Sequence, residues 1–183
     1  MANQVRIIGG VWRSRLLHFA DAPGLRPTPS RVRETLFNWL QFDIIGCRCL
    51  DLFAGSGALG FEAASRGAKR VVMVEQNPQV YSCLATNAAK LSATQVQLVN
   101  LDASCYLQTP AEPFDLVFLD PPFATDWIAQ SSLGLETYGW LGSQAKIYLE
   151  TASQSPLNGL PENWRLLKGK VAGEVAYRLY GRG

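Results

Sequence analysis

The chain has few residues of the kinds that bind metals, with one histidine, His18, and four cysteines among its 183 residues. The cysteines are Cys47, Cys49, Cys83 and Cys105. Their spacing matches no pattern of metal ligands, and a single histidine gives them no partner. We therefore expect no metal site, and we predict reduced thiols in a cytoplasmic protein.

Long apolar runs are also missing. No stretch approaches the roughly 18–20 apolar residues that a membrane-spanning helix requires. Residues 1–10, MANQVRIIGG, lack the long apolar core of a secretory signal. Repeats and low-complexity tracts are absent, and 48% hydrophobic with 17% charged residues is ordinary for a globular chain. These features predict one compact domain without a membrane partner.

Charge is distributed unevenly along the chain, although the net charge is only +2. Residues 1–33 contain six arginines and one acidic residue, a local balance of +5, so residues 34–183 sum to −3. A basic segment on a mildly acidic body is typical of a protein that binds a polyanion. Plain solvated surface is the alternative explanation of these arginines.

The first part of the chain resembles a basic arm. Residues 5–19, VRIIGGVWRSRLLHF, are two short apolar stretches separated by two glycines, which predicts a β-hairpin. A loop rich in proline and glycine follows. A helix is then predicted, with Thr28 as the N-cap and Pro29 in the first helical position. We divide the chain into an N-terminal arm and loop at 1–28 and a main domain at 29–183.

From Arg48 onward, short apolar runs alternate with helical stretches. The runs expected to be strands are CLDLF (49–53), VVMVE (71–75), VQLV (96–99), LVFLD (116–120) and AKIYLE (145–150). Helices are predicted at 58–67 and at 77–91, the second with Asn77 as its cap. This alternation predicts an α/β fold, a mostly parallel sheet with helices on both faces. Two final runs, at 164–173 and 174–180, have no helix between them and predict an antiparallel edge, which makes seven strands.

Four successive strands end at or near an acidic residue. These residues are Asp51, Glu75, Asp102 and Asp120. The carboxyl ends of parallel strands meet at one edge of the sheet, where ligands bind in such folds. A helix cap or an exposed strand end would explain each acid alone, but together they predict a ligand site.

The turn after the first strand reads DLFAGSGALG and satisfies the G-x-G-x-x-G pattern. The pattern is weak evidence and is usual in dinucleotide sites. A pyrophosphate at this helix start would be repelled by Asp51, whereas an ammonium group would be attracted. Glu75 can accept both hydroxyls of a ribose, and Asp102 can accept an adenine amino group. Ammonium, ribose and adenine together favour S-adenosylmethionine over a nicotinamide cofactor.

Residues 117–123, VFLDPPF, end a buried strand on Asp120 and two prolines, whose backbone is stiff and lacks N–H groups. Asp120 can accept one N–H of an exocyclic amine on a base, and the Pro121 carbonyl can accept the other. This places the nitrogen lone pair toward a methyl donor. An aromatic ring at position 123 can stack on an extruded base. The predicted catalytic residues are Asp120, Pro121, Pro122 and Phe123.

These segments resemble the RsmD family of bacterial 16S ribosomal RNA guanine-N2 methyltransferases over nearly the whole chain. The segments that carry the resemblance are RIIGGVWRSRLL, RPTPSRVRETLFNWL, DLFAGSGALGFEAASRGA, VEQN and LDPPF. The resemblance implies a Rossmann-like, S-adenosylmethionine-dependent enzyme that methylates a guanine N2. By matching motifs, the residues that hold the cofactor are Thr28, Arg31, Asp51, Ala54, Gly55, Gly57, Glu75 and Asp102.

The basic arm is predicted to bind the RNA. Arginine side chains bind phosphate oxygens in a bidentate way, and a tryptophan offers a face to an unstacked base. The predicted RNA contacts are Arg6, Trp12, Arg13 and Arg15. The alternative is a hairpin that only covers the sheet, with Trp12 packed inside.

Several other functions share parts of this pattern. A DNA amino-methyltransferase uses the same D-P-P-F chemistry but usually carries a recognition domain, for which 183 residues leave little room. A protein-glutamine methyltransferase usually has asparagine in place of Asp120, and a carbon-5 methyltransferase needs a cysteine near the two prolines. A non-catalytic RNA-binding module is a further alternative. The expected partner is 16S ribosomal RNA or the assembling 30S subunit, bound by a monomer without metal.

Overall fold

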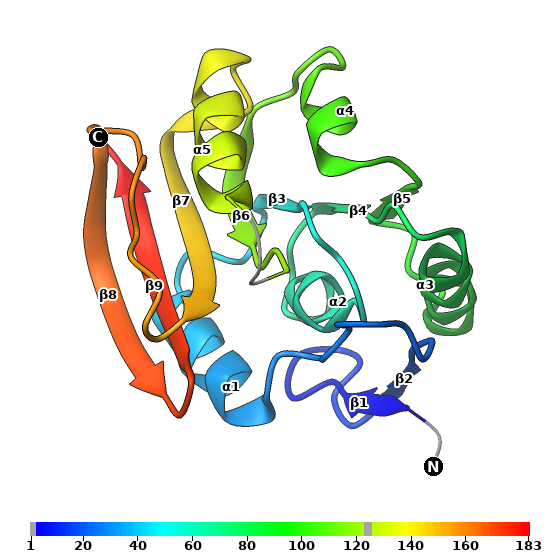
Figure 1. The fold of residues 1–183 in the computed structure, drawn as a ribbon. Coiled ribbons are helices and arrows are strands. Elements are labelled where there is room, and N and C mark those ends of the chain that lie inside the picture. The colour runs from blue at the N-terminus through cyan, green and yellow to red at the C-terminus, as the bar shows by residue number, and fades with distance from the viewer. Residues whose placement is uncertain (1–2, 123–125) are drawn as a thin grey trace.

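The computed structural model describes residues 3–122 and 126–183, and its centre is a sheet with helices on both faces (Figure 1). Seven strands lie in the order β5-β4-β3-β6-β7-β9-β8. The strands are β3 (Arg48–Asp51), β4 (Arg70–Val74), β5 (Val96–Val99), β6 (Phe114–Leu119), β7 (Leu141–Ala152), β8 (Trp164–Ala172) and β9 (Val175–Arg182). The helices are α1 (Ser30–Trp39), α2 (Ala58–Ser65), α3 (Pro78–Leu91), α4 (Ala103–Leu107) and α5 (Trp127–Thr137). The predicted fold class is confirmed.

Side-chain alternation along the strands divides the interior into two cores. In β6, Phe118 packs with α1, α2 and α3 on one face, whereas Val117 and Leu119 pack with α4 and α5 on the other. Successive side chains of a strand point to opposite faces, so strands covered on both sides are apolar at every position. This is why the strand segments read as continuous apolar runs rather than as alternating ones.

The strand pairing brings the carboxyl ends of β3, β4, β5, β6 and β7 to the same edge. Pairs β3–β4, β4–β5, β3–β6 and β6–β7 are all parallel. The last two strands are antiparallel, as predicted, but β9 lies between β7 and β8. Strand β8 is therefore one edge of the sheet, opposite β5 (Figure 1).

The helix boundaries follow the local sequence with one exception. Asn77 caps α3 as predicted, because its side chain accepts hydrogen bonds from the backbone of Gln79 and Val80. The prediction of Thr28 as the cap of α1 is wrong by one residue: Pro29 is the cap and Ser30 begins the helix. Proline has no side-chain acceptor, and the Thr28 hydroxyl is occupied elsewhere. Helices α4 and α5 were not predicted.

The predicted hairpin exists, although its strands are short. Strands β1 (Gln4–Arg6) and β2 (Leu16–His18) pair in antiparallel fashion. Val5, Ile7 and Leu17 are buried in the same core as α1 and α2. The hairpin is thus packed onto the main domain rather than extended from it.

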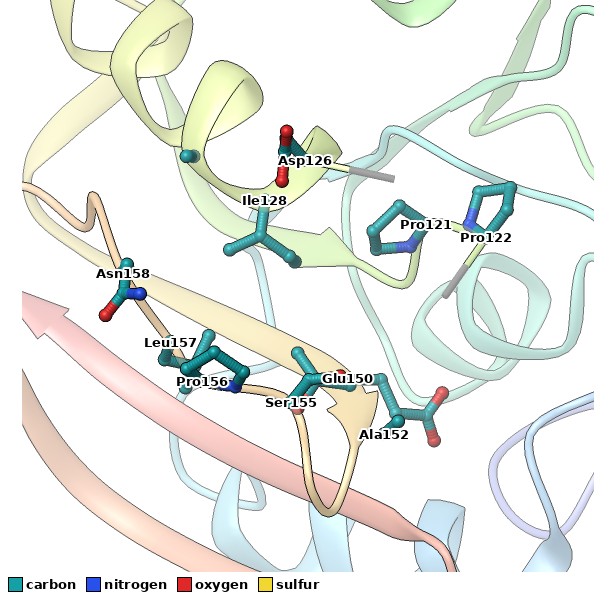
Figure 2. Close-up of a pocket in the computed structure, with 12 residues that line it drawn as sticks. Pro121, Pro122, Asp126, Ile128, Glu150, Ala152, Ser155, Pro156, Leu157 and Asn158 are labelled. Carbon is teal, nitrogen blue, oxygen red and sulfur yellow. The ribbon is translucent and has the colours of Figure 1, made fainter. Parts of the chain in front are cut away.

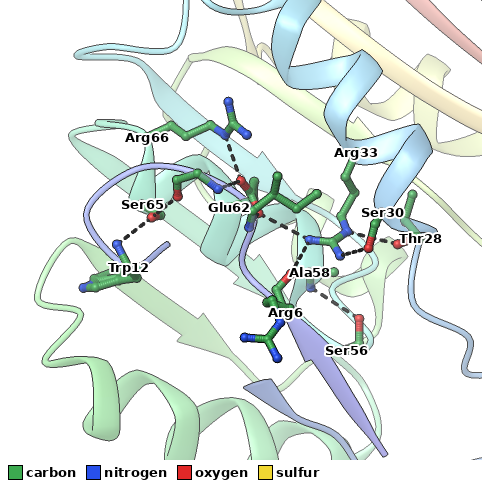
Figure 3. Close-up of polar contacts among 12 residues, drawn as sticks. Arg6, Trp12, Thr28, Ser30, Arg33, Ser56, Ala58, Glu62, Ser65 and Arg66 are labelled. Carbon is green, nitrogen blue, oxygen red and sulfur yellow. Dashed lines mark hydrogen bonds and ion pairs between the residues drawn. The ribbon is translucent and has the colours of Figure 1, made fainter. Parts of the chain in front are cut away.

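A buried carboxylate, Glu62 of α2, anchors the arm (Figure 3). Its two oxygens accept backbone N–H groups of Ile8, at 2.9 Å, and Gly9, at 2.8 Å. The same carboxylate pairs with Arg33 at 3.3 Å and with Arg66 at 2.8 Å. A buried charge of this kind is tolerated only because every oxygen has charged or N–H partners.

Ser65, at the end of α2, makes a second set of contacts with the arm. Its hydroxyl donates to the Gly9 carbonyl at 2.6 Å and accepts from the Trp12 backbone N–H at 2.9 Å. Gly10 has a φ of +78°, and a Cβ there would lie 1.9 Å from the Ser65 carbonyl oxygen. Glycine at position 10 is therefore required for the close approach of arm and helix.

Two negative observations concern the ranges 3–122 and 126–183. Within them, no helix is both long and apolar enough to cross a membrane. The same residues contain no cluster of three or more histidine, cysteine or acidic side chains arranged to hold a metal.

Candidate active site

Asp51, at the end of β3, lies deepest at the carboxyl edge of the sheet. Its side chain is 1% exposed, and one oxygen accepts the Gly60 backbone N–H at 3.1 Å. The other oxygen, Oδ1, is buried without a hydrogen-bond partner. Burial raises the pKa of Asp51 from 3.8 to about 7. A buried acceptor without a donor is costly, so this atom is arranged for a cation or a donor that comes from a ligand.

The glycine turn that follows is held by Glu75, the residue after β4. Its oxygens accept the backbone N–H groups of Gly55, at 3.0 Å, and Asn77, at 2.8 Å. Gly57 has a φ of +78°, and a Cβ there would meet Leu84 and Phe61 side chains at 2.7 Å. Each carboxylate oxygen has two lone pairs, so Glu75 keeps acceptor capacity for a ligand while it shapes the turn.

Two other predicted cofactor residues have local structural roles at the same edge. Buried Ala54 donates its N–H to the Val74 carbonyl at 2.9 Å and accepts from Gly57 at 2.8 Å, which ties the turn to β4. Asp102 caps α4 through Oδ1, which accepts the Ser104 N–H at 2.8 Å. Hydrogen bonds from Ser104 lower the pKa of Asp102. The role of Asp102 toward adenine stays a prediction.

Asp120, the residue after β6, belongs to a network that the sequence reading missed. The Thr28 hydroxyl lies 3.3 Å from Asp120 Oδ2 and also 3.3 Å from Glu150 Oε2. The Tyr148 hydroxyl donates to Glu150 Oε1 at 3.3 Å. Strands β6 and β7 pair Leu119 with Leu149, so the next residues of each strand, Asp120 and Glu150, are neighbours.

Burial raises the pKa of both carboxyl groups, and the two groups affect each other in opposite directions. Burial and the negative neighbour Glu150 raise the pKa of Asp120 well above its usual value. Burial also raises the pKa of Glu150, whereas hydrogen bonds from Asp120, Thr28 and Tyr148 favour its ionised form. The pair therefore retains a proton at a higher pH than ordinary carboxyls do, and that proton resides on Asp120.

A cleft of about 390 Å³ opens beside this pair (Figure 2). Pro121 and Pro122 lie on one side of it, with Ser155, Pro156 and Leu157 on the other. Glu150 lines the cleft from the end of β7. The arrangement can hold a flat ring between apolar walls with carboxyl groups at one side. The predicted stacking residue Phe123 lies outside the described residues.

The predicted RNA contacts lie on a different surface. Arg6, Arg13 and Arg15 are exposed. Arg6 donates to the Ser14 carbonyl at 3.0 Å, and Arg15 donates to the Lys90 carbonyl at 3.2 Å. Trp12 is half-buried and packs against the core. Arg33, one of the six arginines of residues 1–33, is buried in its pair with Glu62 and is not part of this exposed basic surface.

The remaining predicted residue, Arg31, is exposed on the first turn of α1. Glu150 was missed although its segment, AKIYLE, ends on an acid as VVMVE and LVFLD do. Applying the strand-end pattern to this fifth run would have identified it. Glu62 and Arg33 carried a weaker signal, since a charged residue within a helix is usually solvated.

The strand order and the helices on both faces define the Rossmann-like fold of S-adenosylmethionine-dependent methyltransferases. A solved RNA methyltransferase from Salinibacter ruber, in complex with S-adenosyl-L-homocysteine, shares it at a TM-score of 0.65. That protein is 16% identical, with 86% of this chain and 94% of that chain covered. The likeness concerns the fold alone.

The chain belongs to the family described as Conserved hypothetical protein 95, whose model matches residues 5–181. Ribosomal RNA small subunit methyltransferase D of Escherichia coli (strain K12) is 48% identical over 181 residues, which is 99% of this chain and 91% of that protein. The solved structure of the Escherichia coli protein yhhF is 48% identical, has a TM-score of 0.92 and covers 98% of both chains. The resemblance to the RsmD family is thereby confirmed.

Proposed function

We propose that this protein transfers a methyl group from S-adenosylmethionine to the exocyclic N2 amine of a guanine in small-subunit ribosomal RNA. The observation that carries the proposal is the meeting of Asp51, Glu75 and Asp120 at one sheet edge. The family and the names of its relatives support the ribosomal RNA substrate. The choice of N2 follows from the resemblance stated above.

The residues at the edge fit this cofactor. The buried, unpartnered Oδ1 of Asp51 suits a cationic amino group. Glu75 suits the ribose hydroxyls, and Gly55, where an added Cβ would meet no atom closer than 4.0 Å, leaves room for a ligand to approach the backbone of the turn. When bound, the cofactor supplies an electrophilic methyl group on a sulfonium.

Asp120 and the Pro121 carbonyl hold the target amine in this proposal. An amine conjugated with a base is a poor nucleophile, because its lone pair is delocalised into the ring. Acceptors for both N–H groups hold the nitrogen with its lone pair free and stabilise the positive charge that develops on it. Asp120 must be ionised to accept the hydrogen bond from the amine, and it then accepts the proton that the nitrogen loses after methylation.

The basic arm is proposed to bind the RNA, since three of its arginines are exposed on one hairpin. The half-buried Trp12 has a packing role and leaves part of its surface to solvent. The salt dependence of RNA binding tests this assignment, as set out in the Discussion.

The direct test is transfer of a labelled methyl group to ribosomal RNA from a strain that lacks this protein, followed by nucleoside analysis. We expect labelled N2-methylguanosine. Asp120→Ala should lower turnover by several orders of magnitude while S-adenosylmethionine still binds, because the lost contact matters most in the transition state. Glu75→Ala should instead weaken cofactor binding, by roughly 1.5–3 kcal/mol for hydrogen bonds to a charged group.

The alternatives give different results in the same assays. Label in DNA or in a glutamine side chain, with none in ribosomal RNA, would replace the proposal by another amino-methyltransferase. Wild-type turnover in Asp120→Ala would make that carboxylate a structural strand end. Thermal stabilisation by NAD and not by S-adenosylmethionine would reject the cofactor.

A further inference from the structure

Glu150 is a buried acid at the cleft that the proposed chemistry has not yet used. Its side chain is 3% exposed, and it lines the cleft together with the two prolines (Figure 2). Buried carboxylates are rare unless they have a partner or a function. The Tyr148 and Thr28 hydroxyls, each at 3.3 Å, hold it in place.

The orientation of Glu150 follows from its neighbours. Thr28 joins its Oε2 to Oδ2 of Asp120, so the two carboxyl groups stand side by side at the end of adjacent parallel strands. A planar base whose exocyclic amine donates to Asp120 therefore presents to Glu150 the ring atom that lies beside that amine.

The nucleobases differ in this neighbouring group. Guanine presents N1–H beside its N2 amine, which makes two adjacent donors. Adenine and cytosine present an unprotonated ring nitrogen, an acceptor, beside their amines. An ionised carboxylate accepts hydrogen bonds but cannot donate them. It therefore pairs with the two donors of guanine and repels the ring-nitrogen acceptor of adenine or cytosine.

We propose that Glu150 accepts the N1–H of the target guanine while Asp120 accepts an N2–H, so that the carboxyl pair selects guanine over other amine-bearing bases. This inference rests on the proposed function and adds the residue that determines base specificity. It also accounts for a second buried acid beside one that would suffice for holding an amine.

The test uses 2-aminopurine, which keeps the N2 amine of guanine but has no N1–H. The methylated position is first mapped by mass spectrometry of nuclease fragments of the RNA. Ribosomal RNA is then assembled by ligation with guanine or 2-aminopurine at that position, as free RNA or subunit, whichever supports methylation. For the wild type we expect a kcat/KM that is about 100-fold lower with 2-aminopurine, because a site built around a donor rejects an analogue without it.

Glu150→Gln reverses part of this preference. The glutamine amide can donate to the unprotonated N1 of 2-aminopurine, so the ratio between the two substrates should narrow at least about tenfold. Glu174→Gln is the matched control, since it neutralises an exposed acid at the β8–β9 turn and should keep the wild-type ratio. Stabilisation by S-adenosylhomocysteine shows that each variant is folded.

Two results would overturn the inference. One is equal methylation of guanine and 2-aminopurine by the wild type, a measurement that does not depend on any variant folding. The other is an unchanged ratio in folded Glu150→Gln. Absence of N2-methylguanosine altogether would reject the proposed function instead, so the two failures are distinguishable.

Discussion

Replacing Asp51 by asparagine should make the stability of the protein, relative to the wild type, increase as the pH rises. Asp51 is buried with one unpartnered oxygen, and burial raises its pKa from 3.8 to about 7. The folded protein therefore binds the Asp51 proton more tightly than the unfolded chain does. The resulting stability is fully present below about 3.8 and is lost as pH rises toward about 7.

The size of the effect follows from the two pKa values. One pKa unit corresponds to about 1.36 kcal/mol, so the full penalty of ionising Asp51 in the folded state is about 4 kcal/mol. About 1.5 kcal/mol of it is present at about pH 5, and nearly all of it at about pH 8. The asparagine side chain of the variant cannot ionise, and its amide introduces a packing and hydrogen-bonding cost that does not vary with pH. The difference in unfolding free energy between variant and wild type should therefore shift by about 2.5 kcal/mol in favour of the variant between these conditions.

Urea denaturation of both proteins at the two pH values measures this shift. Asp21→Asn is the control, because Asp21 is exposed and its removal should leave the difference the same at both pH values. S-adenosylmethionine should stabilise the wild type and raise the melting temperature of Asp51→Asn much less. A difference in unfolding free energy between Asp51→Asn and wild type that does not change with pH would refute the reasoning. It would mean that Asp51 has the same pKa in the folded and unfolded states.

Three further predictions concern the arm and the carboxyl pair. Glu62→Ala should lower the unfolding free energy by roughly 3–5 kcal/mol, because it leaves buried Arg33 and two N–H groups of the arm unpaired; Glu174→Ala is the surface control in the same denaturation experiment. Neutralising the exposed arginines Arg6, Arg13 and Arg15 should flatten the slope of log RNA affinity against log salt by up to about 2 units. In the control variant, neutralising Arg165, Lys168 and Lys170 on β8 should leave this slope unchanged. Equal slopes in the two triple variants would mean that the arm has only a packing role. Glu150→Gln should move the acidic limb of the pH–rate profile to lower pH, because removing the negative neighbour lowers the pKa of Asp120; a limb that stays in place would mean that another group titrates.

The sequence by itself determined the strands, helices α1, α2 and α3, and the edge of the sheet on which the candidate site lies. Strand and helix signals are local, as the Asn77 cap of α3 and the continuous apolar run of β6 show. The edge that carries the candidate site also follows from sequence, because parallel strands must all end at the same edge. Asp51, Glu75 and Asp120 could therefore be selected without coordinates.

Only the tertiary structure decided which of these groups touch and how they titrate. Glu150 meets Asp120 because β6 and β7 pair in one register, and Thr28 joins them from a loop far away in sequence. The sequence pattern carries no such register. The raised pKa of Asp51 and the anchoring of the arm by Glu62 likewise depend on exclusion of water and on partners that packing supplies. Desolvation and long-range pairing are properties of the assembled core, so the pKa shifts and the contacts of these residues could not be predicted from the sequence.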